Sequence, residues 1–197
     1  AACQMECVLE NKAANFAIAQ KMVEEAAQKG AKLIVLPELF NTGYRVEEND
    51  RALSEPIPGP TTDFLLSFCQ QFQLFIIANI IEKDLTNQEL YNTAFMVSPQ
   101  GKISIYRKIN LYGQEQIRFS PGTELEAWDM NDIKVGCQIC YDVGFPEPAR
   151  ILTLQGAKIL TYPSAFHSIR RYAWDLATRA RALENGLYLI AANRYGA

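Results

Sequence analysis

The sequence contains very little histidine and no marked excess of charge of either sign. Its 197 residues include one histidine, 19 lysines and arginines, and 22 aspartates and glutamates, which gives a formal net charge of −3. This weakly acidic balance does not indicate a nucleic-acid partner or an anionic membrane, because such partners attract basic surfaces. A catalytic cysteine–histidine pair would have to use the single histidine, His167.

Long hydrophobic runs are also absent. The longest apolar stretches, such as residues 74–81, have the length of a strand and fall far short of the ~20 residues that span a bilayer. The N-terminal stretch AACQMECV lacks the basic start and apolar segment of a signal peptide. Five cysteines are an odd number in a chain too large to need disulfides. We therefore expect a globular protein with reduced thiols, located in the cytoplasm and without a membrane partner.

Hydrophobic periodicity alternates between the helical and the extended type along the chain. Apolar residues spaced by three to four predict helices, and short continuous apolar runs predict strands covered on both faces. The predicted helices span residues 11–30, 61–72, 146–156 and 170–186, and the predicted strands span 31–37, 74–81, 133–142, 157–163 and 187–193. Residues 90–108 are predicted to form a hairpin with its turn at 99–101. This order predicts an α/β layered fold with a mixed sheet.

Two segments of the sequence are similar to each other. KGAKLIVLPELF (Lys29 to Phe40) and QGAKILTYPSAF (Gln155 to Phe166) share Gly, Ala, Lys, Pro and Phe at equivalent positions. In both segments a helix is predicted to end at the glycine, and a buried strand then runs to the proline. The similarity suggests a core with two similar halves, each covered by helices.

Cys137 and Cys140, in the stretch VGCQICYD, either act as a pair or include a single nucleophile. In the strand predicted here, residues three apart point to opposite faces and lie ~10 Å apart, beyond the ~7 Å limit for a disulfide. A zinc site shared with Cys3 and Cys7 is disfavoured as well, because ~13 Å between those two residues does not suit a tetrahedral ligand pair. Redox or metal use of the cysteines remains the alternative.

Cys140 differs from the other cysteines because polar and turn residues follow it directly. Pockets in α/β folds open at strand ends, so this thiol is placed like a nucleophile, with backbone N–H groups nearby to hold an oxyanion. A thiol with a pKa of ~8.5 needs activation at neutral pH. His167 lies in a polar segment that favours the surface, whereas Glu38 and Lys108 each follow a predicted strand. Such charged residues are usually solvated, but here a carboxylate, an ammonium and a thiol share this placement.

Three motifs resemble the signatures of the nitrilase superfamily of carbon–nitrogen hydrolases. They are PELF around Glu38, YRK ending at Lys108, and GCQICYDVGFPEPAR around Cys140, and the segment Arg179 to Gly196 is similar to the one that follows in the family. The resemblance implies an αββα sandwich with two mixed β-sheets covered by helices. It also implies one domain over residues 1–197, truncated at both ends, because the chain starts without methionine and family members continue beyond NRYGA.

The resemblance further implies a Glu–Lys–Cys triad. Glu38 would be the general base, Lys108 the electrostatic stabiliser and Cys140 the nucleophile. Glu115 would be a second carboxylate that positions the substrate and the ammonium group. The oxyanion would be held by Lys108 and the backbone N–H of Tyr141. No cofactor and no metal are implied.

The Tyr-Asp pair after Cys140 is similar to the amidase and carbamoylase branches, whereas nitrilases generally have Trp-Glu there. Hydrolysis of a small linear amide through a cysteine thioester is therefore expected, with N-carbamoyl hydrolysis as the alternative and nitrile hydrolysis third. A catalytically silent scaffold relative and a CxxC redox or metal protein are the alternatives from other classes. Candidate pocket residues are Tyr44, Phe145, Phe166, His167 and Trp174, and Arg170 and Arg171 are candidates for binding a substrate carboxylate. The resemblance also implies a homodimer or higher homo-oligomer.

Overall fold

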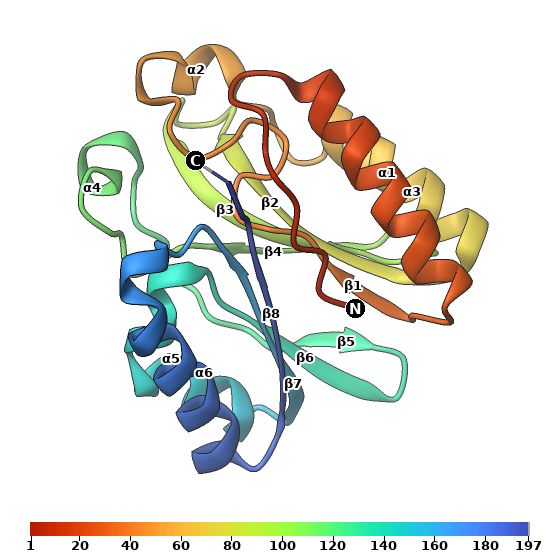
Figure 1. The fold of residues 1–197 in the computed structure, drawn as a ribbon, viewed down its shortest axis with the longest axis vertical. Coiled ribbons are helices and arrows are strands. Elements are labelled where there is room, and N and C mark those ends of the chain that lie inside the picture. The colour runs from red at the N-terminus through yellow and green to blue at the C-terminus, as the bar shows by residue number, and fades with distance from the viewer. Residues whose placement is uncertain (197) are drawn as a thin grey trace.

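Two four-stranded β-sheets lie face to face in the computed structural model, which describes residues 1–196. The first sheet has the strand order β1-β2-β3-β4, and the second has the order β5-β6-β7-β8. Figure 1 shows α1 and α3 outside the first sheet and α5 and α6 outside the second. The layers therefore run helix, sheet, sheet, helix, which confirms the predicted αββα sandwich.

The strands are β1 (Leu33–Val35), β2 (Phe75–Lys83), β3 (Leu90–Val97), β4 (Ile103–Arg107), β5 (Trp128–Met130), β6 (Ile133–Cys137), β7 (Ala157–Ser164) and β8 (Tyr188–Asn193). The α-helices are α1 (Lys12–Gln28), α2 (Asp50–Leu53), α3 (Pro60–Phe72), α4 (Glu115–Arg118), α5 (Pro146–Leu154) and α6 (Arg171–Asn185). Short 3₁₀ helices are η1 (Glu47–Asn49), η2 (Cys140–Gly144) and η3 (Ser168–Arg170). All four long helices and the hairpin of β3 and β4 were predicted from the periodicity.

Strands β1, β2 and β3 of the first sheet are buried on both faces, whereas the edge strand β4 is partly exposed. β1 pairs with β2 in parallel, and β2, β3 and β4 form an antiparallel meander. Along β2 the side chains alternate between two cores: Ile76 and Ile80 pack with residues of α1 and α3, whereas Ile77 packs with residues of the second sheet. A strand that must fill a core on each side has no polar face, which explains the continuous apolar runs in the sequence.

The second sheet holds β6, β7 and β8 in parallel, and β5 adds an antiparallel edge. Helix α5 packs closely on β6 at Gly136. A Cβ at this position would lie 2.8 Å from Leu160 Cδ2 and 2.9 Å from Leu152 Cδ1, so only glycine leaves room for that approach. β5 escaped the sequence prediction because three residues carry no periodic signal.

The two similar sequence segments supply one strand to each sheet. β1 belongs to the first sheet and β7 to the second, each preceded by a long helix, as the similarity of the segments predicted. Glu38 and Ser164 occupy equivalent positions just after the apolar part of each segment. The Glu38 N–H donates to the Ser164 carbonyl at 3.4 Å, so the two sheets meet at this point.

The predicted strand over residues 133–142 is too long. β6 ends at Cys137, and Cys140 begins η2 with a left-handed backbone angle, φ +44°. The Asp142 carboxylate accepts the N–H of Ile139 at 2.9 Å, and the Asp142 N–H donates to the Ile139 carbonyl at 3.0 Å. These two bonds close a tight turn, which ends the extended backbone before the second cysteine of the stretch.

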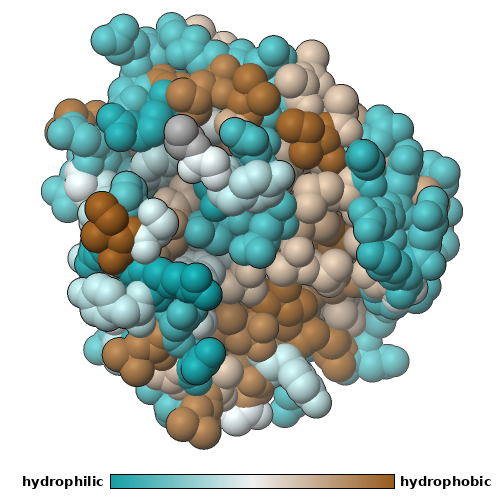
Figure 2. Space-filling view, viewed as in Figure 1, coloured by the Kyte–Doolittle hydropathy of each residue, from teal (hydrophilic) through white to brown (hydrophobic). Residues whose placement is uncertain are grey.

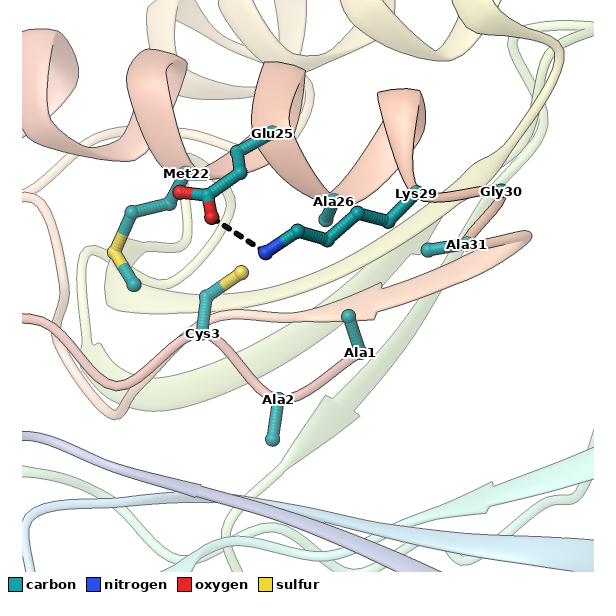
Figure 3. Close-up of a pocket in the computed structure, with 9 residues that line it drawn as sticks. All are labelled: Ala1, Ala2, Cys3, Met22, Glu25, Ala26, Lys29, Gly30 and Ala31. Carbon is teal, nitrogen blue, oxygen red and sulfur yellow. Dashed lines mark hydrogen bonds and ion pairs between the residues drawn. The ribbon is translucent and has the colours of Figure 1, made fainter.

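The surface shows where the exposed polar residues and a hollow lie. Figure 2 shows polar side chains over the side of α1, whose buried face carries Ala19, Val23 and Ala26. A hollow of about 410 Å³ lies between the first residues and α1 (Figure 3) and is lined by Ala1, Ala2, Cys3, Met22, Glu25, Ala26, Lys29, Gly30 and Ala31. None of the predicted site residues lines it.

No helix within residues 1–196 is both long enough and apolar enough to cross a membrane.

Candidate active site

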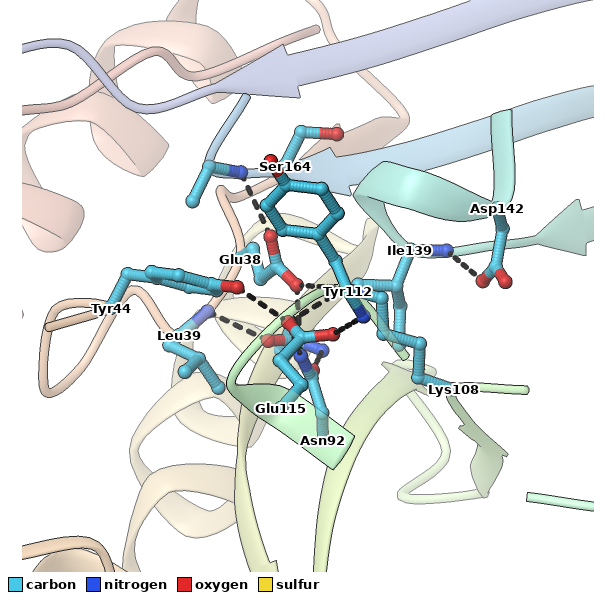
Figure 4. A network of polar contacts seen from close by, with 12 residues as sticks. Glu38, Leu39, Tyr44, Asn92, Lys108, Tyr112, Glu115, Ile139, Asp142 and Ser164 are labelled. Atoms are coloured by element: carbon cyan, nitrogen blue, oxygen red, sulfur yellow. Dashed lines mark hydrogen bonds and ion pairs between the residues drawn. The ribbon is translucent and has the colours of Figure 1, made fainter. Parts of the chain in front are cut away.

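The Lys108 ammonium lies between two carboxylates in the interior. Its Nζ is 2.8 Å from Glu38 Oε1 and 2.8 Å from Glu115 Oε1, and all three side chains are fully buried. Figure 4 shows them converging from different elements: Glu38 follows β1, Lys108 follows β4, and Glu115 opens α4. Burial alone lowers the pKa of Lys108, but the surrounding negative charges, that of Glu38 foremost, raise it above its ordinary value. The two ion pairs and the raised pKa both favour the ammonium form of Lys108 in this site.

Asn92 donates to both carboxylates and is itself held by Asn79. Asn92 Nδ2 donates to Glu38 Oε1 at 2.8 Å and to Glu115 Oε1 at 3.1 Å. Its own Oδ1 accepts from Asn79 Nδ2 at 2.8 Å, and Asn79 Oδ1 accepts the backbone N–H of Leu39 at 2.7 Å. The chain of amides connects β2 and β3 to the backbone just after Glu38. Each buried amide is thereby hydrogen-bonded, as burial of polar groups requires.

Glu115 accepts more hydrogen bonds than Glu38 does. Besides Lys108 and Asn92, its Oε1 accepts from the Tyr44 hydroxyl at 2.9 Å, and its Oε2 accepts the N–H of Tyr112 at 2.8 Å. Burial, together with the negative charge of Glu38, raises the pKa of Glu115 above its ordinary value. The four donors hold this side chain in one orientation.

Cys140 faces this cluster from the second sheet. Its side chain is buried, with 7% of the residue exposed, and it lies close enough for the charges of Glu38 and Lys108 to act on its thiol. Burial raises the pKa of the thiol well above its ordinary value, and Glu38 raises it further, whereas Lys108 and a backbone hydrogen bond from Ala165 lower it. The Ala165 N–H also donates to Glu38 Oε2 at 2.9 Å. The Ala165 N–H thus anchors the Glu38 carboxylate on the side that faces the second sheet.

The Asp142 side chain links the turn at Cys140 to the residues on either side of Lys108 through hydrogen bonds. Its Oδ2 accepts from the Tyr106 hydroxyl at 2.8 Å and from the Ile139 N–H at 2.9 Å. Its Oδ1 accepts from the Asn110 N–H at 3.1 Å and from Asn110 Nδ2 at 2.9 Å. Burial raises the pKa of Asp142, and these donors together with the charge of Lys108 oppose that rise. The carboxylate thus joins residues on both sides of Lys108 to residues on both sides of Cys140.

The whole chain, residues 1–197, matches the model of the carbon-nitrogen hydrolase family. The chain belongs to the carbon–nitrogen hydrolase family. A protein of Pyrococcus abyssi named nitrilase is 41% identical over 186 residues, which cover 92% of this chain and 69% of that protein. The omega-amidase NIT2-A of Xenopus laevis is 36% identical over 193 residues, with coverage of 92% and 69%. The solved structure of Saccharomyces cerevisiae Nit3, a member of branch 10 of the nitrilase superfamily, matches with a TM-score of 0.90 at 31% identity, covering 98% of this chain and 74% of that one.

The predicted site residues of this carbon–nitrogen hydrolase are the four proposed reactive residues and five candidate pocket residues. Glu38, Lys108, Cys140 and Glu115 lie together, and their catalytic roles stay predictions. Of the five candidate pocket residues, Tyr44 contacts the site through Glu115, and Phe145 packs edge-on against Tyr141, with ring centroids 5.3 Å apart. Phe166 packs on the apolar cluster that contains Cys140 and also contacts Trp174, with ring centroids 5.1 Å apart in a tilted arrangement. His167 is exposed, and its ring accepts the N–H of Ile169.

Other residues of this carbon–nitrogen hydrolase site escaped the sequence reasoning. Asn79 and Asn92 lie inside the buried strands β2 and β3, and Asp142 was noted only as a marker of the strand end. A signal for the asparagines does exist, because an amide in a strand buried on both faces needs a buried partner. All five cysteines are free thiols, and no group of three or more metal-ligating side chains suited to an ion occurs within residues 1–196.

Proposed function

We propose that this protein hydrolyses the C–N bond of a small linear amide through a thioester on Cys140. The observation that carries the proposal is the fully buried Lys108 ammonium, 2.8 Å from each of two carboxylates and beside a buried thiol. The raised pKa of Cys140 means that the free enzyme holds a neutral thiol, which needs a base at the moment of attack. Glu38 is the carboxylate whose charge acts more strongly on the Cys140 thiol than that of Glu115 does, so it is the base in this proposal.

In the proposed reaction, Glu38 takes the thiol proton while the sulfur attacks the amide carbonyl carbon. The oxygen that becomes negative is held by the Lys108 ammonium and the Tyr141 N–H, and a lost donor of this kind typically costs ~3–4 kcal/mol of transition-state stabilisation. Glu38 then gives its proton to the departing nitrogen, and the C–N bond breaks to leave an acyl thioester. Water attacks the thioester as Glu38 accepts its proton, and the carboxylic acid leaves as the proton returns to sulfur. Such proton transfers contribute about 10²–10⁴ in rate.

The choice of amide over nitrile rests on the Tyr-Asp pair that follows Cys140 and on the name omega-amidase of one relative. The relative named nitrilase keeps nitrile hydrolysis as an alternative, and N-carbamoyl hydrolysis uses the same thioester step. A silent scaffold relative is disfavoured because nothing in a merely structural role requires three buried charges around a thiol.

Mass spectrometry of the intact protein mixed with small amides, ureido acids and nitriles tests the proposal. We expect an acyl adduct on Cys140 with an amide. Cys137→Ala is the matched control for Cys140→Ala, since both thiols are buried and burial raises the pKa of Cys137 to about 12. Only Cys140→Ala should abolish turnover and the adduct. Equal loss in both variants would instead indicate a paired CxxC function.

We also propose that the protein acts as a homo-oligomer in the cytoplasm. Leu176 and Leu183 of α6 are 70% and 85% exposed, and burial of such side chains against a second copy stabilises a dimer. Light scattering after gel filtration should give at least twice the mass of 22.2 kDa expected for one chain. A monomer at micromolar concentration would contradict this.

A further inference from the structure

Asn79 is hydrogen-bonded to two uncharged groups of the site, a backbone N–H and the Asn92 amide. It is fully buried on β2, and its Oδ1 accepts the N–H of Leu39, the residue next to Glu38, at 2.7 Å. Its backbone carbonyl also accepts the N–H of Phe40 at 3.3 Å. Leu39 has a left-handed backbone, φ +47°, which a bulky side chain adopts only when its surroundings hold it. Asn79 therefore fixes the strained turn that directly follows Glu38.

The direction of the hydrogen bonds along the amide chain is fixed at both ends. The Leu39 N–H can only donate, so the Asn79 amide must turn its oxygen to it and its NH₂ to Asn92. Asn92 must then offer its own oxygen to Asn79. This leaves the NH₂ of Asn92 for Glu38 and Glu115. Ionised carboxylates only accept, so they match the direction that the backbone sets. Figure 4 shows Leu39, Asn92 and Glu115 gathered around this chain.

A reversed Asn92 amide would direct its oxygen at two carboxylates. Its Nδ2 lies 2.8 Å from Glu38 Oε1 and 3.1 Å from Glu115 Oε1, so an oxygen in its place would be repelled by both. Glu38 would then move away from Lys108, or one carboxylate would take up a proton, and either change removes the base from the thiol. The titratable groups around this amide are Glu38, Tyr44, Lys108, Glu115 and Cys140.

Resting on the proposed function, we propose that Asn79 is a positioning residue for the general base: through the Leu39 N–H it sets which end of the Asn92 amide meets Glu38. Asn79 acts through these neighbours and not on the reacting atoms. Its effect on the rate is one of geometry, since a misplacement of about 1 Å far from the chemistry can cost about 10²-fold.

Steady-state kinetics of Asn79→Asp and Asn79→Leu test this proposal. A protonated aspartate accepts from Leu39 and donates to Asn92 as the amide does, whereas an ionised aspartate only accepts and makes Asn92 reverse. Relative to wild type at the same pH, kcat of Asn79→Asp should lie within about threefold at pH 5 and fall about 10- to 100-fold by pH 9, with KM nearly unchanged. Asn79→Leu should lose kcat to a similar extent at every pH, and Asn79→Asp decides the matter if Asn79→Leu does not fold.

Asn15→Asp is the matched control. Asn15 is also fully buried, and its amide bonds only backbone groups, the N–H and carbonyl of Val8 and the carbonyl of Asn41. Asn15→Asp should lower the free energy of unfolding as the pH rises, because a buried carboxyl group resists ionisation. Its kcat in the folded protein should keep a constant ratio to that of wild type.

Proton–nitrogen correlation spectra of the side-chain amides in Cys140→Ala need no turnover, so they separate this inference from the proposed amidase activity. The Asn92 amide signals, assigned by their absence in Asn92→Leu, should shift more between pH 5 and pH 9 when Asn79→Asp is added than without it. That shift supports the role of Asn79 even if no amide substrate is hydrolysed. An Asn92 signal that does not respond, a pH-independent kcat ratio for Asn79→Asp, or a wild-type kcat in Asn79→Leu would overturn the proposal.

Discussion

Replacement of Asn92 by aspartate would place a third carboxyl group against the two that flank Lys108. Asn92 now gives both hydrogens of its amide, one to Glu38 at 2.8 Å and one to Glu115 at 3.1 Å. The Asn92→Asp side chain has the same shape but supplies at most one hydrogen, and only when it is protonated. Three buried carboxylates around a single ammonium cannot all be charged, so the new group should take up a proton in the folded state.

The size of this effect follows from proton linkage. An aspartate in the unfolded chain has a pKa of ~3.9, and holding it neutral costs about 1.36 kcal/mol for each pH unit above that value. The penalty is about 1.5 kcal/mol at pH 5 and about 4 kcal/mol at pH 7. Folding raises the pKa of the new carboxyl group, so the penalty is absent below the unfolded pKa and the free energy of unfolding falls as the pH rises above it. A lost hydrogen bond to a charged acceptor adds about 1.5–3 kcal/mol at every pH.

The assay is urea unfolding of the wild type, Asn92→Asp and Asn92→Leu between pH 5 and pH 8. Asn92→Leu removes both hydrogen bonds without adding an ionisable group, so its deficit should not depend on pH. The difference in free energy of unfolding between the two variants should therefore grow with pH by about 1.4 kcal/mol per unit. A constant difference would mean that the new aspartate stays ionised, and the reasoning about a crowded, buried charge cluster would be wrong.

Three further predictions concern the turn and the core. Asp142→Asn should lower the free energy of unfolding by about 1–3 kcal/mol and reduce kcat more than it changes KM, since an amide cannot accept from all four donors. Tyr106→Phe removes one of these donors and should have a smaller effect. A larger effect of Tyr106→Phe in urea unfolding and kinetics would contradict this role of Asp142. The rate of Cys140 alkylation by iodoacetamide, followed by peptide mapping, should still increase above pH 9 because burial raises the pKa of the thiol. A rate that reaches its plateau below pH 8 would indicate a thiolate and contradict this prediction. Gly136→Ala should destabilise by about 1–3 kcal/mol because its Cβ would lie 2.8 Å from Leu160 Cδ2; an unchanged melting temperature would show that the leucine yields freely.

Much of the fold could be predicted because the signals were local. Helix α1 begins where Asn11 accepts the N–H of Ala14 at 3.0 Å, and α6 ends at Gly186, whose left-handed conformation glycine adopts without strain. The strands buried on both faces were visible as continuous apolar runs. The positions of Glu38 and Lys108 followed from their place just after such runs, together with the family motifs.

The remainder depended on contacts between segments far apart in the sequence. The strand ends before Cys140 because the Asp142 side chain closes the turn and is itself held by Tyr106 and Asn110 from the other sheet. The amide chain of Asn79 and Asn92 requires knowledge of which strands are neighbours. Periodicity describes the faces of an element, and it does not identify the partner across the core.

The reactive groups divide between the two sheets: Glu38, Lys108 and Asn92 come from the first, and Cys140 and the Ala165 N–H come from the second. Any intermediate in which the sheets separate would retain much of its helix and strand content while losing the proximity of acid, cation and sulfur. During gradual denaturation, turnover should therefore be lost before the two sheets separate or at the same time. The enzymatic rate then reports whether the two sheets are still packed together.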